Sequence, residues 1–449
     1  MASPEAVFLE DARSDRVVRY GELAGLAGRA AALGADGAVL VAAEDPIDFA
    51  LLYLAVLSAG LRVAPVAPET SEAALATLRK QFAAATAVVR AIDELPAAHA
   101  GGAALAAGSA VLFTSGSTGT PKGVELGEAQ LLHVARAVAR HNRLTTGDRG
   151  YNPLPLFHIN AEVVALLATL VAGGTLVLDR RFHRTGFWAL MRERRITWIN
   201  AVPAMLAILA KDPVDAPDGL RFIRSASAPL PAAVATAFSG VPLVVSYGMT
   251  EAASQITATP LGGGAPAGSV GRPVGAELEV RDDDGRPLPA ASVGRIWIRG
   301  AGVISRYFAD VAADRFDADG WLSTGDVGRI DENGFLTLLG RSDDVINRGG
   351  ELVYPADVED VLLGDPRVRE AVVVGRPDPV LGHVPVAFVV PAEATDADEL
   401  RAALIERVTA ELPRHLRPVE LTVTDDLPRA ATGKVQRARI RAALAEDAK

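Results

Sequence analysis

The segment Leu112–Gly123 reads LFTSGSTGTPKG, and its composition sets it apart from the rest of the chain. Hydroxyl residues, glycines, a proline and a lysine fill the ten positions from Thr114 to Gly123. That mixture does not suit the interior of a helix or a strand, so we expect a loop after the apolar residues AVLF. The backbone N–H groups and hydroxyls of such a loop can donate to phosphate oxygens, and Lys122 adds a positive charge.

Two better-known motifs do not fit this loop. The P-loop of nucleotide kinases has the form G-x-x-x-x-G-K-[ST], but here Pro121 precedes the lysine. The nucleophile elbow G-x-S-x-G fails because Ser115 stands where its first glycine should be. A flexible surface linker is the remaining structural alternative.

Composition limits the function classes. The chain has 449 residues, of which 49% are hydrophobic and 22% charged, so we expect a globular protein of two or three domains. Its formal net charge of −10 argues against a general binder of nucleic acid or of an anionic membrane. The chain has no cysteine, which excludes disulfides and thiolate chemistry and fits a cytoplasmic location.

Two apolar stretches resemble membrane spans in composition but do not fit one. The first, 49–61, is too short, because a spanning helix needs about 20 residues. The second, 163–178, is interrupted by Gly173 and Gly174 and is better explained as helix, turn and strand. The N-terminal MASPEAVFLEDARSD has no basic region followed by an apolar run, so we predict neither a signal peptide nor a span.

The chain before residue 268 alternates helical and strand-like patterns. Helices are predicted over 20–33 and 49–61, and GAVLVAA, GGTLVLD, ITWINAVP and PLVVSYG are typical of short buried strands. This alternation predicts largely parallel sheets covered by helices. Short strands and Asp-Gly or Asn-Gly turns then indicate a small β-barrel-like unit, followed by an α+β region. We predict an α/β protein with a large N-terminal domain, 1–342, and a small mobile cap, 343–449.

The hydroxyl-rich loop resembles the phosphate-binding signature of the adenylate-forming superfamily, which includes acyl-CoA synthetases, amino-acid-activating adenylation domains and beetle luciferases. The resemblance implies that the loop holds the β- and γ-phosphates of ATP. The residues concerned are Thr114, Ser115, Gly116, Ser117, Thr118, Gly119 and Lys122.

Further signatures of the family follow in order and cover nearly the whole chain. SASAPLP, with Ser227, Ala228 and Pro229, resembles the loop beside the adenine, and SYGMTEA, with Tyr247, Gly248 and Met249, resembles its partner. The resemblance implies that Thr250 contacts phosphate and carboxylate oxygens and that Glu251 is a ligand of Mg²⁺. A carboxylate oxygen is also the ligand that this hard cation prefers.

The C-terminal third of the chain carries the other expected positions. Asp326 resembles the carboxylate that binds the ribose hydroxyls, and Arg341 a nearby donor. Asp343 falls at the family's hinge, about which the cap rotates between half-reactions. Gly349 and Gly350 resemble the glycines that line the pantetheine tunnel of CoA. Lys434 resembles the lysine that enters the site for adenylation.

The segment from residue 152 onward, NPLPLFHINAEVV, contains the residues expected to lie beside the acyl group of the substrate. Phe157 and His158 resemble the family's gate beside the acyl pocket, although a histidine there could also cap a helix. The form LPLFHINA most resembles crotonobetaine/carnitine-type acyl-CoA ligases. Asn160 and Glu162 could place a polar or cationic acyl tail, and Glu162 could equally face solvent. A departure is Arg306 before Tyr307, where the family usually has glycine.

The resemblance implies an AMP-forming acid:CoA ligase that uses ATP, Mg²⁺ and CoA on a small carboxylic acid, in a context such as fatty acid metabolism. Two alternatives stay open. One is a biosynthetic adenylating enzyme that hands its acyl group to a carrier protein, an amine or another nucleophile. The other is a non-catalytic homologue that senses nucleotide. The sequence leaves room for a homodimer and implies no nucleic-acid partner.

Overall fold

The computed structural model describes residues 2–35, 37–82, 86–97, 107–114, 122–308, 313–429 and 435–447. The chain divides into two compact units. The first comprises residues 1–230, 237–278 and 297–323, and the second residues 231–236, 279–296 and 324–449. The sequence predicts a domain boundary between residues 342 and 343, beyond which a C-terminal cap moves. That boundary stays a prediction.

A nine-stranded sheet organises the first unit, with strand order β14-β13-β12-β11-β10-β8-β9-β1-β2. Strands β12, β11, β10, β8, β9 and β1 are mutually parallel, whereas β13, β14 and β2 are antiparallel additions. The strands are β1 (Val7–Asp11), β2 (Val17–Arg19), β8 (Arg149–Asn152), β9 (Thr175–Leu178), β10 (Trp198–Ala201), β11 (Phe222–Ser225), β12 (Leu243–Tyr247), β13 (Thr257–Ala258) and β14 (Arg272–Pro273).

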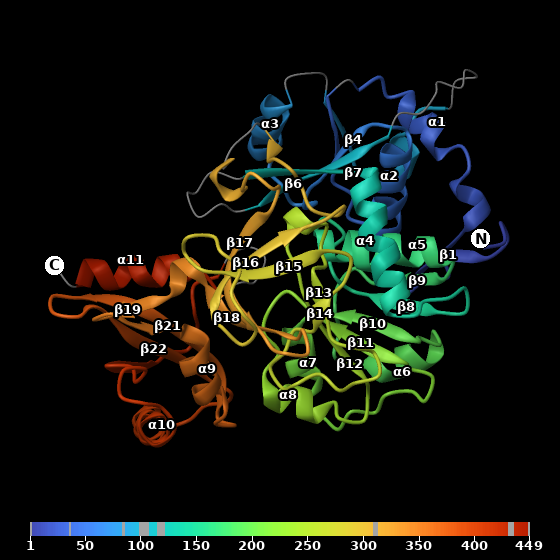
Figure 1. Ribbon diagram of the computed structural model, residues 1–449. Coiled ribbons are helices and arrows are strands. Elements are labelled where there is room, and N and C mark those ends of the chain that lie inside the picture. The colour runs from blue at the N-terminus through green and yellow to red at the C-terminus, as the bar shows by residue number, and fades with distance from the viewer. Residues whose placement is uncertain are drawn as a thin grey trace. The chain divides into compact units, whose positions relative to one another are not determined.

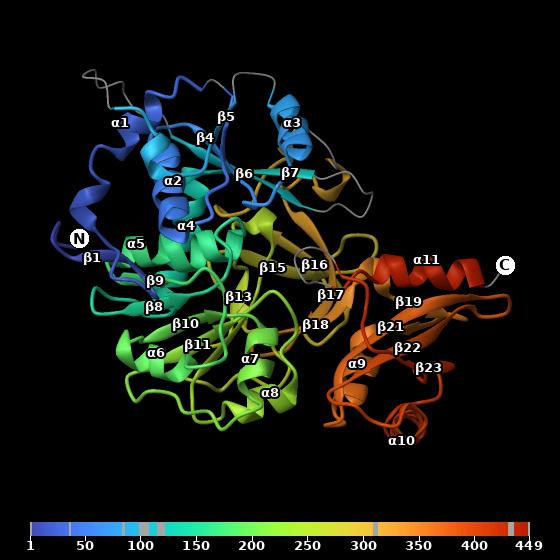
Figure 2. The ribbon, with the colours of Figure 1, turned by 180° about the vertical axis from the view of Figure 1, so that it is seen from behind.

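A second, five-stranded sheet of the first unit has the order β5-β3-β4-β6-β7 and is parallel except for the β6–β7 hairpin. Its strands are β3 (Val39–Val41), β4 (Arg62–Pro65), β5 (Ala87–Val89), β6 (Ser109–Thr114) and β7 (Lys122–Gly127). Figures 1 and 2 both show α4 (Glu128–His141) and α5 (Ala168–Ala172) between the two sheets, with α6 (Phe187–Glu193) and α7 (Pro203–Leu209) on the far face of the larger one.

Some of the helices begin where the sequence supplies a side-chain cap. Helix α2 (Pro46–Ser58) starts with proline at its first position, and the Asp45 carboxylate accepts hydrogen bonds from the N–H groups of Ile47 and Asp48. Most of its residues are buried, which explains why this helix is apolar on all sides. Helices α1 (Leu26–Ala31), α3 (Glu72–Gln81) and α8 (Ala232–Ala237) are shorter.

Two sequence predictions for this unit have opposite outcomes. The single helix predicted over 20–33 is wrong in detail, because Gly25 adopts a φ of +84° and separates a 3-10 turn, η1 (Tyr20–Leu23), from α1. The predicted break at Gly173 is confirmed: a π-helix, η3 (Asn160–Leu167), and α5 end there at a φ of +76°, and β9 follows. Among the described residues, no helix is long and apolar enough to cross a membrane.

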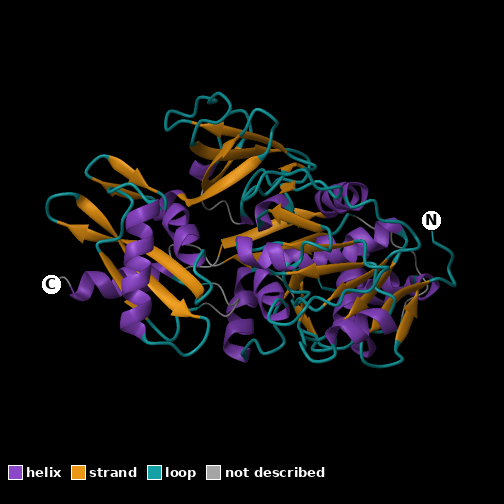
Figure 3. Cartoon of the chain, turned by 90° about the horizontal axis from the view of Figure 1, so that it is seen from below, coloured by secondary structure: helices purple, strands orange, loops and turns teal. Residues whose placement is uncertain are grey.

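Short strands replace the alternating pattern after residue 276. Strands β15 (Glu277–Arg281), β16 (Gly294–Arg299), β17 (Leu322–Ile330) and β18 (Leu336–Arg341) follow one another in a four-stranded sheet. The second unit also has a five-stranded sheet in which β19 (Ile346–Arg348), β20 (Glu351–Val353), β21 (Val368–Asp378), β22 (Gly382–Pro391) and β23 (Glu420–Val423) take part. Figure 3 shows the mixed helix and strand content that the sequence predicts.

Three helices accompany these strands in the second unit: α9 (Pro355–Leu363), α10 (Ala397–Glu411) and α11 (Arg437–Asp447). Leu400, Leu404 and Val408 of α10 recur at helical spacing and pack with Val373 and Val389 of the sheet in one buried cluster. The α/β class and the α+β C-terminal region are therefore confirmed.

Candidate active site

The hydroxyl-rich segment connects the two strands of a hairpin. The backbones of Thr114 and Lys122 pair across β6 and β7, so residues 115–121 link the strand ends. Ser115, Gly116, Ser117, Thr118 and Gly119 lie outside the described residues. The predicted loop bounds are therefore too wide, because Thr114 belongs to β6 and Lys122 and Gly123 belong to β7. The phosphate contacts stay a prediction.

The SYGMTEA segment turns sharply at the carboxyl end of β12. A Cβ atom on Gly248 would lie 1.4 Å from the carbonyl oxygen of Ser254, so only glycine fits there. The 3-10 turn η4 (Thr250–Ala252) follows at once, and the half-buried Thr250 begins it. The carboxyl edge of a parallel sheet is where open α/β folds bind ligands.

Glu251 belongs to a buried cluster of polar side chains, of which the sequence predicts only Glu251 as a site residue. Its Oε1 accepts hydrogen bonds from the hydroxyl of Tyr307 at 2.7 Å and from Nη1 of Arg315 at 3.2 Å. Arg315 also donates to the Tyr307 hydroxyl and to the Ser323 carbonyl. Among the described residues none donates a hydrogen bond to Glu251 Oε2. One carboxylate oxygen is therefore held in place and the other is open to a hard cation.

The predicted adenine-side residues gather at the same edge. Strands β11 and β12 are parallel neighbours, so Ser225 and Tyr247, their last residues, end on one side of the sheet. The exposed turn 227–229 follows β11, and Ser227 has a φ of +78°, which is rare for a residue with a side chain. Tyr247, at the end of β12, is half-buried. Ser227, Ala228 and Pro229 thus share one sheet edge with Tyr247, Gly248 and Met249.

In the second unit, the predicted ribose-side residues form a pair. Asp326 and Arg341 are cross-strand partners in β17 and β18, and Arg341 Nη1 lies 3.0 Å from Asp326 Oδ1. Gly325 has a φ of +77°, and a Cβ atom there would lie 2.7 Å from Arg341 Nη2. The positive φ favours glycine beside the aspartate, which agrees with the sequence TGD.

The predicted CoA-side glycines have a local structural reason. Gly349 and Gly350 have φ values of +63° and +94° and form the two-residue turn between β19 and β20. Positive φ at both positions is typical of a tight hairpin turn, and the Gly350 N–H also donates to Asn347 Oδ1 at 2.8 Å. The turn explains the glycines without CoA, so their role toward pantetheine stays a prediction.

Lys434 lies outside the described residues, but the ends of its loop are fixed. Arg429 and Val435 form an isolated β-bridge, and the Gln436 N–H donates to the Pro428 carbonyl at 2.8 Å. Next along the chain, Arg437 makes two hydrogen bonds to the Glu359 carboxylate, at 2.7 and 2.9 Å. The chain on both sides of Lys434 is thus pinned to the second unit.

His158 is not used as a helix cap. The π-helix η3 begins after Ile159 without a side-chain cap, and among the described residues none hydrogen-bonds the His158 ring. The ring packs against Phe157 with the centroids 4.6 Å apart, and burial lowers the pKa of His158 below its usual value. The imidazole is therefore neutral near pH 7, and its role as a gate stays a prediction.

Glu162 is fully buried, so the expectation that it could face solvent is wrong. Within the described part of the chain, neither of its carboxylate oxygens makes a hydrogen bond of good geometry, although the buried Tyr53 hydroxyl lies close enough to favour the charged form slightly. Burial raises the pKa of Glu162 to about 8. The side chain is mostly protonated at pH 7 and does not offer the negative charge that a cationic acyl tail would need.

This burial predicts how stability depends on pH. Because the pKa is raised from 4.5 to about 8, the folded chain holds a proton that the unfolded chain releases, so stability falls as pH rises through that window. We expect the wild type to lose about 2 kcal/mol between pH 6 and 8, and E162Q to lose much less. Urea unfolding at pH 6, 7 and 8 measures both slopes. Equal slopes in the two proteins would show that Glu162 is ionised in the fold.

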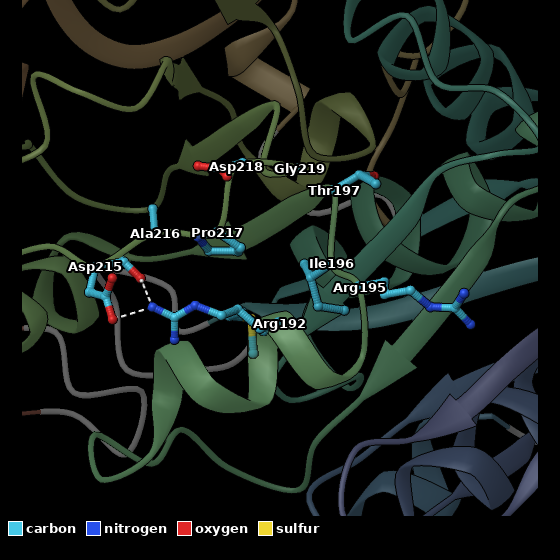
Figure 4. A pocket seen from close by; sticks show the side chains of 10 residues that line it. Arg192, Arg195, Ile196, Thr197, Asp215, Ala216, Pro217, Asp218 and Gly219 are labelled. Carbon is cyan, nitrogen blue, oxygen red and sulfur yellow. Dashed lines mark hydrogen bonds and ion pairs between the residues drawn. The ribbon is translucent and has the colours of Figure 1, made fainter.

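A surface hollow elsewhere in the first unit does not belong to this edge. It lies between α6 and the segment 215–219, and an ion pair between Arg192 and Asp215 crosses it (Figure 4). Its residues Arg195, Ile196 and Thr197 directly precede β10, so they mark the amino ends of the strands. Ligands of parallel sheets bind at the opposite ends. We therefore exclude this hollow as the active site.

Two family models match the chain. The AMP-binding enzyme family matches residues 106–308, and the AMP-binding enzyme C-terminal domain matches residues 357–434. The chain is 36% identical to the sulfoacetate–CoA ligase of Cupriavidus necator over 97% of this chain and 94% of that protein. It is also 36% identical to the oxalate–CoA ligase of Arabidopsis thaliana, over 74% of this chain and 66% of that one.

A solved structure agrees with these relatives. The o-succinylbenzoate CoA synthetase of Bacillus subtilis, in complex with its acyl-adenylate intermediate, has a TM-score of 0.86 at 29% identity and covers 98% of this chain and 96% of that one. The same enzyme was also solved with ATP and magnesium ion.

The chain belongs to the AMP-binding enzyme family. Its homologues are AMP-forming CoA ligases, a class that uses ATP, Mg²⁺ and CoA, and the chain is an enzyme of this ATP-dependent acid–CoA ligase class. The predicted family and fold class are thereby confirmed. The narrower likeness to crotonobetaine/carnitine-type ligases stays a prediction, since the relatives named above act on other acids.

Proposed function

We propose that this chain activates a small carboxylic acid with ATP and transfers the acyl group to CoA, with the roles given below. In the first step a carboxylate oxygen attacks the α-phosphorus of ATP, the acyl-adenylate forms and pyrophosphate leaves. In the second step the CoA sulfur attacks the acyl carbonyl carbon, the bond from that carbon to the phosphate oxygen breaks and AMP leaves. Neither step needs a nucleophile from the protein.

One observation carries the proposal. The exposed turn 227–229, Tyr247, Thr250 and Glu251 occupy one edge of the parallel sheet in a chain that matches a CoA ligase over 97% of its length. An aromatic ring suits a flat base, and a hydroxyl and a carboxylate suit phosphate oxygens and their cation. We assign Tyr247 to adenine, Thr250 to the reacting oxygens and Asp326 with Arg341 to the ribose.

The donors expected around the triphosphate come from several segments. The 114–122 loop, with Lys122, is assigned to the β- and γ-phosphates, and Lys434 to the charge that develops during adenylation. Glu251 fits Mg²⁺ through its open oxygen, and no group of three or more acidic or histidine residues in the described ranges forms an all-protein metal cage. That agrees with a cation held largely by substrate phosphates. When bound, Mg²⁺ neutralises phosphate charge.

The second step is assigned to a movement of residues 343–449 about Asp343. This movement would place Gly349 and Gly350 beside the pantetheine arm of CoA. His158 would move aside so that the arm can reach the acyl-adenylate. A carrier protein as the alternative acceptor, and a homodimer, are further proposals. The relatives named above activate sulfoacetate, oxalate and o-succinylbenzoate, each of which carries two acidic groups.

A panel of acids tests this function. The purified chain is incubated with ATP, Mg²⁺ and each acid, with and without CoA, and pyrophosphate, AMP and the acyl thioester are measured. We expect pyrophosphate, AMP and thioester in equal amounts when CoA is present. AMP without thioester would favour the alternative of another acceptor, and no pyrophosphate with any acid would contradict the proposal.

A further inference from the structure

Arg224 is a charged residue inside an apolar strand. It is the third residue of β11, in the sequence FIRS, and only 1% of its surface is exposed. Asn200 lies directly opposite it on β10, and the Asn200 amide donates to Asn152 Oδ1 on β8 at 2.9 Å. These strands lie side by side in Figure 2, and the three side chains form a polar row close to their carboxyl ends.

The partners of the Arg224 guanidinium are all neutral. Its Nη1 donates to Asn160 Oδ1 at 2.7 Å and to Asn200 Oδ1 at 3.2 Å, and its Nε donates to Gln255 Oε1 at 3.3 Å. No carboxylate from the described ranges pairs with it, and Nη2 has no hydrogen-bond acceptor there. Burial lowers the pKa of Arg224 to about 9, so the group is still protonated at pH 7. Burying a cation without a charged partner costs free energy. Buried cations in proteins are therefore usually paired with an anion or bound to a ligand.

The neighbouring amides add donors that lack acceptors. Asn160 Nδ2 and Gln255 Nε2 are buried and have no hydrogen-bond partner among the described residues. Each belongs to a side chain whose oxygen already accepts from Arg224, so each amide nitrogen stays available beside the guanidinium. A buried cation together with unused N–H donors is the complement of an anion.

The position of this cluster in the fold relates it to the part of the site that is proposed to bind the acyl group. Asn160 opens the π-helix η3, two residues after His158, and π-helices occur often at functional sites. Gln255 follows the η4 turn that carries Thr250 and Glu251. The cluster is thus built from the two segments that the proposed function assigns to the acyl gate and to the reacting oxygens.

We infer that Arg224, Asn160 and Gln255 bind a second anionic group of the acid substrate. The substrate class is then a small carboxylic acid with a second carboxylate or a sulfonate a few atoms away, and a simple monocarboxylic acid is a poor substrate. This inference rests on the proposed function, because it identifies the acid of that same reaction. The reacting carboxylate faces the α-phosphate while the distal anion compensates the buried charge.

Matched pairs of acids test this inference. Pyrophosphate release is measured with malonate against propionate, succinate against butyrate, and sulfoacetate against propionate, using the wild type, R224M and R224K. We expect the wild type to favour the better dianionic acids by roughly 100-fold in kcat/KM, since charged hydrogen bonds in a buried site are strong. R224M should lose most of that preference, and R224K should keep part of it.

The control is R221M. Arg221 precedes the same strand and pairs with Asp148, near the amino ends of the sheet, so its loss should leave the preference unchanged. Binding gives a second readout: a dianionic acid with AMP should raise the melting temperature of the wild type but not of R224M. Equal kcat/KM within every pair, or a preference that survives in R224M, would overturn the inference. Failure of all acids would instead refute the proposed function.

Discussion

Replacing Lys434 by alanine is expected to lower acid-dependent pyrophosphate release by at least about 100-fold. Negative charge builds up on the phosphate oxygens as the carboxylate attacks, and loss of one positioned donor in such a site costs on the order of 10²–10³ in rate. The pinned bridge between Arg429 and Val435 holds the chain on both sides of this residue. Formation of the thioester from supplied acyl-adenylate should change only a few-fold, because Lys434 is assigned to the first step alone.

K211A provides the control for general effects of removing a lysine, because Lys211 is exposed and lies in a separate turn after α7. It should keep the parent rate in both half-reactions. If K434A still formed acyl-adenylate at the parent rate, the assignment of the C-terminal lysine loop would be wrong. If the rates of both half-reactions fell equally, Lys434 would support the structure of the C-terminal cap rather than stabilise the transition state of adenylation.

Replacing Glu251 by glutamine is expected to have the second large effect. The change keeps the size of the side chain but removes the charge that Tyr307 and Arg315 hold in place. We expect adenylation to fall by roughly 100-fold and the half-saturating Mg²⁺ concentration to rise, since a hard cation binds a neutral amide less well. Pyrophosphate release is titrated with Mg²⁺ at a fixed ATP concentration.

The comparison variant is Y307F. It removes one hydrogen bond to Glu251 and keeps the carboxylate, so it should cost only several-fold and should shift the Mg²⁺ titration slightly. Tyr307 and Arg315 therefore act as positioning residues for Glu251. An E251Q protein with the parent rate and the parent Mg²⁺ dependence would remove Glu251 from the metal site.

Much of the fold follows from local pattern. The alternation of apolar runs with helical spacing predicts the parallel sheets, because strands buried on both faces need continuous apolar residues. Gly173, and Gly349 with Gly350, mark turns because each has a positive φ that other residues rarely adopt. Several predicted site segments likewise fall on strand ends and turns, since local sequence decides where a strand stops, but Asp326 lies inside β17.

The contacts between distant segments could not be predicted from the sequence. Arg315 lies 64 residues from Glu251 and Tyr307 lies 56 residues from it, so no spacing rule relates them. The sequence does not identify Arg224 as a site residue, although a charged residue inside the apolar strand FIRS is a signal for one. The pairing of Arg224 with Asn160 depends on a π-helix, which apolar spacing does not distinguish from an α-helix.

The central claim is that a carboxylate attacks the α-phosphorus of ATP in this chain. It is tested by following ¹⁸O from a labelled carboxylic acid, the best substrate of the panel, through complete turnover with ATP, Mg²⁺ and CoA. We expect one labelled oxygen per turnover in the phosphate of AMP and none in pyrophosphate. Formation of ADP with the label in inorganic phosphate, or AMP without label, would contradict it.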